Sequence, residues 1–499
     1  MNDKEIHTMK YFIGIDVGTS SVKSLLMGEN GSVLGVAQRE YDISKPYSSW
    51  AEQDIESLWR ATAETLRELT GKYPCEVAGI GYSGQMHGLV SLDKSNKPVR
   101  PAIIWADQRS GDSIAWINSR VPDYRDITFN SLSTGFLLAS LIWVRDNEPE
   151  NYEKISHVML PKDYIRFRMT GELGTEVSDA SATAAFDVAK REWAWDMLAK
   201  LNLPREIFVP CRDSSDIAGK VTRACADETG LPEGVPIVYG GGDTLVQTVG
   251  NGVTDSLISN IGTASQLLCP INSPLHDSEF RTNTFCHVAN SQWLIMGANL
   301  TGGVALKWLR GILGLDSYDE MTKLALEAGP GANGVIFLPY LNGERTPWND
   351  PRARGIFFGL GLEHGRKDLI RATMEGIIFA QRESLEIFRG MGLKFDRVVV
   401  SGGGARSQAF REIIASVLNC EVVTNKVNEQ GCIGAAILSA VGTGFFANIN
   451  EACKQVVKFN DAVTSPNSEI SKLYDDIFIN KFHKLYPNNK ELFATSSAL

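Results

Sequence analysis

A single carboxylate, Asp243, follows three consecutive glycines at the end of the apolar run 235–239. The run predicts a buried strand, and α/β proteins bind ligands beyond the ends of such strands. Because glycines have no side chains, another molecule can approach the backbone of residues 240–242 closely. A carboxylate presented in such a pocket suits a general base. The same residues would also suit a plain turn closed by an Asx hydrogen bond, and both interpretations stay open at this point.

Two other segments, residues 11–21 and 257–265, share one pattern. Each has an apolar strand, a polar residue and one more apolar residue, followed by Gly-Thr and small residues. Glycine permits a tight turn whose N–H groups and hydroxyls can hold the anionic oxygens of a phosphate. The polar residue is Asp16 in the first segment and Asn260 in the second. Only the first segment therefore offers a carboxylate, the ligand type that suits magnesium.

A second pattern also occurs twice: the apolar runs 77–82 and 398–400 each end in Ser-Gly. Strand-then-loop units at corresponding places in two halves predict an internal duplication. The series restarts near residue 252, where we place the domain boundary. Periodicity and turn residues predict two strands around the turn at residues 28–31, a helix that opens at Pro161, and helices over residues 53–72, 300–312, 366–390, 408–418 and 429–442.

The chain of 499 residues exceeds a usual single core, so two domains are expected. Its net charge of −10 argues against nucleic acid or an anionic membrane as a partner. No apolar run reaches the roughly 18 residues of a membrane span. Residues 1–8 are polar without a signal-peptide core, and we expect a short disordered lead. The eight cysteines form no Cys-x-x-Cys pair, so we expect reduced thiols in a cytoplasmic protein.

The ordered motifs resemble the FGGY carbohydrate kinases over residues 10–445. Gln-Met-His-Gly at residues 85–88 is similar to the xylulokinase branch of that family. The resemblance implies an α/β fold of the duplicated actin-like (ribonuclease H-like) ATPase type, with two domains around an ATP cleft. It implies a sugar-binding domain with the catalytic base over residues 10–252 and a nucleotide-binding domain over 253–490. The motifs lie at residues 16–23, 83–88, 160–164, 240–243, 338–347 and 401–407.

The activity that this resemblance implies is transfer of the γ-phosphate of ATP, with Mg²⁺, to a hydroxyl of a small open-chain sugar. D-xylulose giving D-xylulose 5-phosphate is the leading expectation. The chain departs from xylulokinases at Ala106, Ser140 and Thr244, where that branch usually carries Asn, Lys and Asn. Because two of these positions adjoin the expected sugar pocket, gluconate, another ketose or a polyol is the alternative acceptor. A non-catalytic, nucleotide-switched actin-like protein is the alternative of another class. We expect sugar and ATP as partners and leave homodimer formation open.

By the same resemblance, Asp243 is the catalytic base and lies at the sugar site with Met86, His87 and Trp105. Asp16 and Asp243 are implied to hold magnesium, mostly through ATP and water. The residues implied to contact ATP or its phosphates are Asp16, Thr19, Ser20, Lys23, Gly262, Thr263, Gly302, Gly403, Ala405 and Ser407.

Simpler roles for some of these residues stay open. His87 would also fit as a buried structural histidine. Trp105 would also fit as an aromatic anchor beside a surface ion pair of Asp107 and Arg109. Glu344 and Arg345 are expected to form a buried structural pair.

Overall fold

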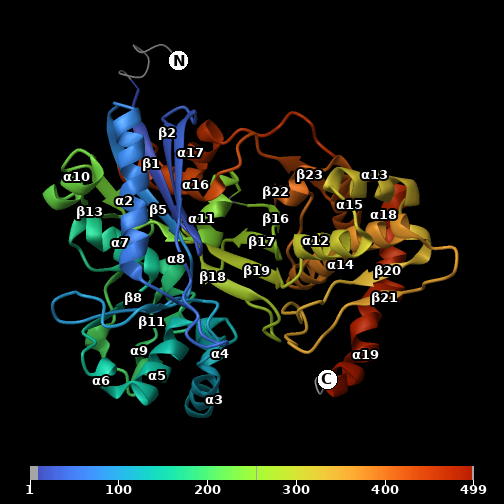
Figure 1. Cartoon of the computed structure of the whole chain (residues 1–499), viewed down its shortest axis with the longest axis horizontal. Coiled ribbons are helices and arrows are strands. Elements are labelled where there is room, and N and C mark those ends of the chain that lie inside the picture. The colour runs from blue at the N-terminus through green and yellow to red at the C-terminus, as the bar shows by residue number, and fades with distance from the viewer. Residues whose placement is uncertain (1–8, 254, 497–499) are drawn as a thin grey trace.

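The computed structural model describes residues 9–253 and 255–496, so the expected N-terminal lead lies outside the described residues. The chain forms two lobes that lie side by side, each built around a mixed β-sheet with helices packed on it (Figure 1). The predicted α/β class is confirmed.

The first sheet is built from β1 (Tyr11–Val17), β2 (Ser21–Gly28), β3 (Val33–Glu40), β5 (Val77–Gly84), β13 (Ile217–Lys220), β14 (Pro236–Val238) and β15 (Gly241–Gly242). Its order is β13-β14-β5-β1-β2-β3, and β15 pairs with the end of β5. The sequence predicted two strands around the turn at residues 28–31, but three are present. The reason is a second tight turn after β1, in which Gly18 N–H donates to the carbonyl of Ser21 over 3.0 Å.

The second sheet is built from β16 (Leu257–Ile261), β17 (Ser265–Ile271), β18 (Asn283–Cys286), β19 (Trp293–Asn299), β22 (Arg397–Gly402) and β23 (Glu421–Thr424). Its order is β18-β19-β17-β16-β22-β23. β16 is antiparallel to β17 and parallel to β22, just as β1 is antiparallel to β2 and parallel to β5. The two sheets therefore repeat one strand pattern, as the predicted duplication requires.

Helices cover these sheets and fill the spaces between the short strands. Those of the first half are α2 (Ile55–Lys72), α3 (Gly111–Arg120), α4 (Tyr124–Thr128), α5 (Leu137–Asn147), α6 (Pro149–Tyr152), α7 (Pro161–Thr170), α8 (Val177–Ala180), α9 (Trp195–Lys200), α10 (Arg223–Thr229) and α11 (Asp243–Gly250). Those that follow are α12 (Gly303–Leu313), α13 (Tyr318–Ala328), α14 (Arg366–Gly390), α15 (Gln408–Leu418), α16 (Gln430–Gly442), α17 (Ile449–Val456), α18 (Ser468–Ile477) and α19 (His483–Ser496).

The predicted helices agree closely with this set, because α2, α7, α12, α14, α15 and α16 lie where the apolar periodicity placed them. Short strand pairs complete the fold: β4 (Glu52–Gln53) with β7 (Ala102–Ile103), β6 (Val90–Leu92) with β8 (His157–Met159), β9 (Thr175–Glu176) with β12 (Cys211–Arg212), β10 (Phe186–Asp187) with β11 (Glu192–Trp193), and β20 (Ile336–Leu338) with β21 (Ile356–Phe358). Within residues 9–253 and 255–496, no helix is long and apolar enough to cross a membrane.

Helix α16 packs on the first sheet although it follows the second sheet in sequence. The backbone of α16 lies in close contact with the backbones of α11 and β1. A Cβ atom on Gly14 of β1 would lie 1.8 Å from the carbonyl oxygen of Cys432, and one on Gly250 of α11 would lie 1.8 Å from that of Gln430. Because no larger residue fits at these points, glycines let α16 join the strand that carries Asp16 to the helix that begins at Asp243.

Candidate active site

Asp243 is the first residue of α11, directly after β15, whose pairing with β5 fixes its position. A Cβ atom on Gly242 would lie 2.8 Å from Cγ of Met86, so a larger residue here would have to displace that side chain. The Oδ1 atom of Asp243 accepts from the N–H of Thr244 over 2.5 Å and from its hydroxyl over 3.1 Å. Its Oδ2 atom makes no hydrogen bond within the part of the chain that the structure describes. One carboxylate oxygen is therefore held in place and the other is available to a ligand.

The surroundings of Asp243 adjust its acidity. Burial, together with the negative charge of Asp16, raises the pKa of Asp243 to about 7, and the two hydrogen bonds from Thr244 oppose this rise. A general base works best when its pKa lies near the working pH. Asp243 is therefore a carboxylate that can accept a proton near neutrality.

Asp16 lies at the end of β1, directly beside the end of β5. Its Oδ1 accepts a hydrogen bond of 2.7 Å from the hydroxyl of Ser83. Burial raises the pKa of Asp16, while this bond and the positive charge of Lys23 oppose the rise. Lys23 itself forms an ion pair of 2.8 Å with Glu429, the residue that precedes α16, and both side chains are 32% exposed. No pattern in the sequence pointed to Glu429, whose carboxylate is the partner of Lys23 in this structure.

The second sheet holds an uncharged counterpart of this arrangement. Asn260 pairs with Ser401 in the register of β16 and β22, as Asp16 pairs with Ser83 in that of β1 and β5. The hydroxyl of Ser401 lies 3.3 Å from Oδ1 of Asn260. The two halves thus offer the same geometry with different charge.

Met86 and His87 follow β5, and Met86 packs against Gly242, the residue that precedes Asp243. His87 has a left-handed backbone (φ 75°), and its ring stacks on Phe136 with 4.1 Å between centroids. Its Nδ1 bonds the carbonyl of Ala182 over 2.6 Å. Burial lowers the pKa of His87 to about 4, so the ring is neutral and Nδ1 carries the hydrogen. Its Nε2 is therefore an acceptor, and no described residue bonds it.

Trp105 follows β7 and is 44% exposed. Its indole N–H donates to the hydroxyl of Thr19 over 2.9 Å, so Trp105 contacts the tight turn between β1 and β2. A Cβ atom on Gly135 would lie 2.4 Å from the carbonyl oxygen of Trp105, so the residue before Phe136 must be small. The backbone of Trp105 therefore lies against the segment that carries Phe136, whose ring stacks on His87.

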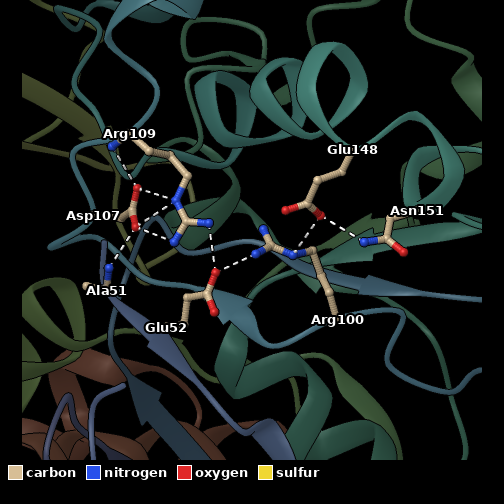
Figure 2. A network of polar contacts seen from close by, with 7 residues as sticks. All are labelled: Ala51, Glu52, Arg100, Asp107, Arg109, Glu148 and Asn151. Carbon is tan, nitrogen blue, oxygen red and sulfur yellow. Dashed lines mark hydrogen bonds and ion pairs between the residues drawn. The ribbon is translucent and has the colours of Figure 1, made fainter. Parts of the chain in front are cut away.

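Asp107 and Arg109, which the sequence suggested as a surface ion pair, are buried instead. Their side chains are 0% and 1% exposed, and they lie 2.7 Å apart. Arg109 also pairs with Glu52 over 2.7 Å, and Glu52 in turn bonds Arg100 (Figure 2). The guanidinium of Arg109 lies 3.6 Å from the ring centroid of Trp50. Trp50 and Trp143, which are distant in sequence, cover Arg109, and this is why the burial of the pair was not foreseen.

A fully buried cluster of charges lies beneath the ends of β5 and β15. Lys162 Nζ lies 2.7 Å from Asp163, 3.3 Å from Glu176 and 3.6 Å from Asp179, and all four side chains are 0% exposed. Neither carboxylate oxygen of Asp179 accepts a hydrogen bond from the described residues. Burial raises the pKa of Asp179 well above its ordinary value, and Lys162 opposes this rise.

This cluster touches the backbone that carries the site. The Oε2 atom of Glu176 accepts from the N–H of Ser178 over 2.7 Å, and the hydroxyl of Ser178 accepts from Gly242 N–H over 3.0 Å. On the other side, a Cβ atom on Gly84 would lie 2.6 Å from Cβ of Lys162. The charged cluster therefore supports both strand ends at which Asp16 and Asp243 are held.

A cavity of about 390 Å³ lies in the second lobe, where β16, α12, α13 and the turn after β22 meet. Its walls combine glycines, hydroxyls and apolar side chains. Four of the predicted nucleotide residues line it, namely Gly262, Thr263, Gly403 and Ser407. The apolar part of the wall, which the sequence analysis missed, comes from Ile261, Val304, Leu306, Met321, Met374 and Phe410.

Other predicted nucleotide residues lie outside this cavity. Gly302 precedes α12 and donates its N–H to the carbonyl of Thr263 over 2.9 Å. It therefore supports Thr263, which lines the cavity. The carbonyl of Ala405 accepts a hydrogen bond from Arg411. Thr19 and Ser20 lie in the turn of the first lobe, and the hydroxyl of Thr19 holds Trp105.

Glu344 and Arg345 do not form the expected side-chain pair. Oε1 of Glu344 accepts from the backbone N–H groups of Arg345 and Leu300, over 2.8 and 2.9 Å. Glu344 is buried, and burial raises its pKa to about 8. The guanidinium of Arg345 forms no hydrogen bond or ion pair with the residues described here.

Family models match both halves of the chain. Residues 11–250 match the N-terminal domain of the FGGY family of carbohydrate kinases, and residues 257–443 match its C-terminal domain. This chain belongs to the FGGY carbohydrate kinases. It is 36% identical over 434 residues to the xylulose kinase of Escherichia coli K12, covering 86% of this chain and 90% of that protein. It is 30% identical over 452 residues to the gluconokinase of Bacillus subtilis 168, covering 87% and 88%.

A solved FGGY kinase structure shares the whole fold. The ligand-bound xylulose kinase from Lactobacillus acidophilus matches with a TM-score of 0.93 and 25% identity, over 98% of this chain and 100% of that one. The family and the two-domain kinase architecture predicted from sequence are confirmed, and the protein is a carbohydrate kinase that acts on a sugar and ATP.

Proposed function

We propose that this FGGY kinase transfers the γ-phosphate of ATP to D-xylulose and forms D-xylulose 5-phosphate. The observation that carries the proposal is Asp243, whose Oδ2 atom is free and whose pKa is about 7, directly after Gly242, which packs on Met86. The relative with 36% identity is a xylulose kinase, which favours this acceptor over others.

In the proposed reaction, Oδ2 of Asp243 accepts the proton of the acceptor hydroxyl as that oxygen bonds to the γ-phosphorus. The bond to the bridging oxygen of ATP breaks, and ADP leaves with the electron pair. Phosphoryl transfer needs alignment and charge neutralisation more than covalent help from the protein. The neutral His87 accepts a hydrogen bond from a second hydroxyl of the sugar at Nε2.

The carboxylates of Asp16 and Asp243 fit a magnesium ion held mainly through water and phosphate. They are electrostatically coupled, and a cation near them would relieve the cost of two buried negative charges. Within the described ranges, no third acidic, thiol or imidazole group joins them to build a full protein cage. Magnesium keeps several waters in such sites, and when bound it neutralises charge on the phosphates.

For the nucleotide, we place the base and ribose of ATP in the cavity of the second lobe. Its apolar walls suit a flat heteroaromatic ring, and the hydroxyl of Thr263 suits phosphate. We therefore propose the division into a sugar-binding part over residues 10–252 and a nucleotide-binding part over 253–490. The packing of α16 on the first sheet links the two. A cytoplasmic location and a homodimer stay predictions.

Gluconate is the second candidate acceptor. It is favoured by Thr244, which differs from the usual xylulokinase residue beside the base, and by the gluconokinase relative. Assays of ADP release with ketoses, polyols and aldonates decide between them. We expect the highest kcat/KM with D-xylulose. A higher value with gluconate would replace the proposed substrate, and ATP hydrolysis indifferent to every acceptor would favour a nucleotide-switched protein.

A further inference from the structure

The stretch of chain directly before Asp243 cannot hold a position by itself. Residues 240–242 are consecutive glycines, and glycine loses more conformational freedom on folding than any other residue. Strand β15, formed by two of them, pairs with β5 and with no other strand among residues 9–253 and 255–496. Asp243 begins α11 directly after this strand. The unpaired side of β15 therefore needs another contact if the carboxylate of Asp243 is to lie at a fixed point.

Ser178 of α8 supplies that contact. Its hydroxyl oxygen accepts a hydrogen bond of 3.0 Å from the N–H of Gly242, and the residue is 0% exposed. A Cβ atom on Gly241 would lie 3.0 Å from the same oxygen, so the hydroxyl lies close against both residues of β15. A buried amide N–H without a partner is costly, and the ladder to β5 does not reach this side of the strand. The hydroxyl of Ser178 thus holds the backbone next to the base.

The backbone of Ser178 is itself fixed on buried groups. The two carboxylate oxygens of Glu176 accept from the N–H groups of Ser178 and Asp179, over 2.7 and 2.9 Å. Glu176 also accepts from the hydroxyl of Ser214 over 2.7 Å. The hydroxyl of Ser181 donates to the carbonyl of Ser178 over 2.7 Å. Because the N–H and the carbonyl of Ser178 are both bonded, its hydroxyl meets β15 from a fixed point.

The same segment also carries the contact of His87. Four residues after Ser178, the carbonyl of Ala182 bonds Nδ1 of His87 over 2.6 Å. Residues 176–182 therefore contact both the backbone before the base and the imidazole proposed to bind the sugar. The rate of a reaction between bound groups depends steeply on their placement, and a shift of about 1 Å can lower it by about 10²-fold.

We propose that Ser178 is a positioning residue for phosphoryl transfer, and that its hydroxyl fixes the place of Asp243 through the N–H of Gly242. Ser178 transfers no proton itself. It sets the point at which Oδ2 of Asp243 meets the acceptor hydroxyl, and residues 176–182 thereby hold the base and His87 in a constant relation. This inference rests on the proposed function, because it requires Asp243 to be the base.

A double-mutant cycle tests the inference. The proteins are the full chain as wild type, Ser178→Ala, Asp243→Asn and the double variant. Ser439→Ala is the matched control, because Ser439 is also 0% exposed and its hydroxyl donates to the carbonyl of Ala436 within its own helix. For each protein, ADP release with D-xylulose and with gluconate gives kcat and the KM for ATP. Calorimetry gives the Kd of the acceptor, and a melting curve gives the stability.

We expect Ser178→Ala to lower kcat by about 10- to 100-fold, as for a displacement of about 1 Å, with the KM for ATP and the Kd of the acceptor unchanged. In the Asp243→Asn background the same substitution should have no further effect on kcat, because the base is already absent. Ser178→Cys keeps a weak acceptor at this position and should retain more activity than Ser178→Ala. Ser439→Ala should have the kcat of wild type.

A wild-type kcat in Ser178→Ala, or an equal loss of kcat with and without Asp243, would overturn the inference and leave the kinase activity standing. A purely structural serine would give that equal loss together with a lower melting temperature. If Ser178→Ala does not fold, Ser178→Cys takes its place in the cycle and is judged in the same way. If Asp243→Asn keeps the kcat of wild type, or wild type phosphorylates neither compound, the proposed function fails and this inference fails with it.

Discussion

Asp16 and Asn260 occupy equivalent register positions in the two sheets, each opposite a serine on a parallel strand. The backbone is thus repeated, while the carboxylate is present once. If both halves carried a carboxylate at this position, a second negative charge would lie near the phosphates of the proposed ATP. This difference between a carboxylate and an amide is the reason why we propose the metal-linked role for the first half.

Asp16→Asn would make the first turn resemble the second. We expect the magnesium concentration for half-maximal activity to rise by about 10- to 100-fold, as when a group that acts through metal-bound water is lost. Titration of activity with Mg²⁺ at saturating ATP and sugar measures this. Ser401→Ala, which alters the equivalent serine of the second sheet, is the control and leaves the titration unchanged. A wild-type titration in Asp16→Asn would mean that Asp16 is structural.

Asp243→Asn should lower kcat by about 10²- to 10⁴-fold, because the amide cannot accept a proton. ATP binding, followed by calorimetry, stays intact. Retention of a tenth or more of the activity would remove Asp243 from the role of base.

The same variant should be more stable than wild type at alkaline pH. The folded pKa of Asp243, about 7, exceeds the ordinary value of 3.8, so its contribution to stability is present at low pH and is lost as pH rises between these values. Asn carries no such cost. We expect the melting temperature of Asp243→Asn minus that of wild type to grow from pH 4 to pH 8, without ligands. A constant difference would contradict the raised pKa.

His87→Asn keeps a residue that tolerates the left-handed backbone but removes the imidazole. We expect kcat/KM for the sugar to fall by about 5- to 100-fold, the range for an unpaired polar contact, with KM for ATP unchanged. Because the pKa of His87 is lowered to about 4, the loss should be equal at pH 6 and pH 8. Equal losses for sugar and ATP, with a lower melting temperature, would show a purely structural histidine.

Lys162→Met removes the only cation of a cluster that holds three buried carboxylates. Breaking such a group costs about 3–5 kcal/mol of unfolding free energy. The defect should shrink as pH falls, because burial raises the pKa of Asp179, which then takes up a proton. Urea denaturation at pH 8 and pH 5.5 tests this. Lys190→Met, which breaks an exposed pair with Asp187, should have almost no effect.

Much of the fold could be predicted because its signals are local. Apolar periodicity located α2, α14 and α15, and the repeated Gly-Thr turns revealed the duplication. Asp243 stood out because three glycines precede it. The number of strands over residues 10–40 was wrong because the turn after β1 is built from small residues, which reverse the chain without a strong break in hydrophobicity.

Long-range partners could not be predicted in this way. Glu429 lies 406 residues from Lys23 along the chain, and no pattern near either residue announces their ion pair. The burial of Asp107 and Arg109 depends on Trp50 and Trp143, which approach only in the folded protein. The free guanidinium of Arg345 is likewise a property of three-dimensional surroundings. Sequence motifs therefore pointed to the two carboxylates of the candidate site better than to the groups that position them.

The packing of α16 on β1 has a consequence for synthesis. The ribosome releases residues 11–250 long before residue 442 is made, so the face of β1 that receives Cys432 stays uncovered in the meantime. At typical elongation rates of 5–20 residues per second, this interval lasts about 10–40 s. During it, a nearly complete sheet exposes apolar surface of the kind that chaperones bind. We therefore expect the nascent chain to depend on chaperones until α16 has left the ribosome and packs on the first sheet.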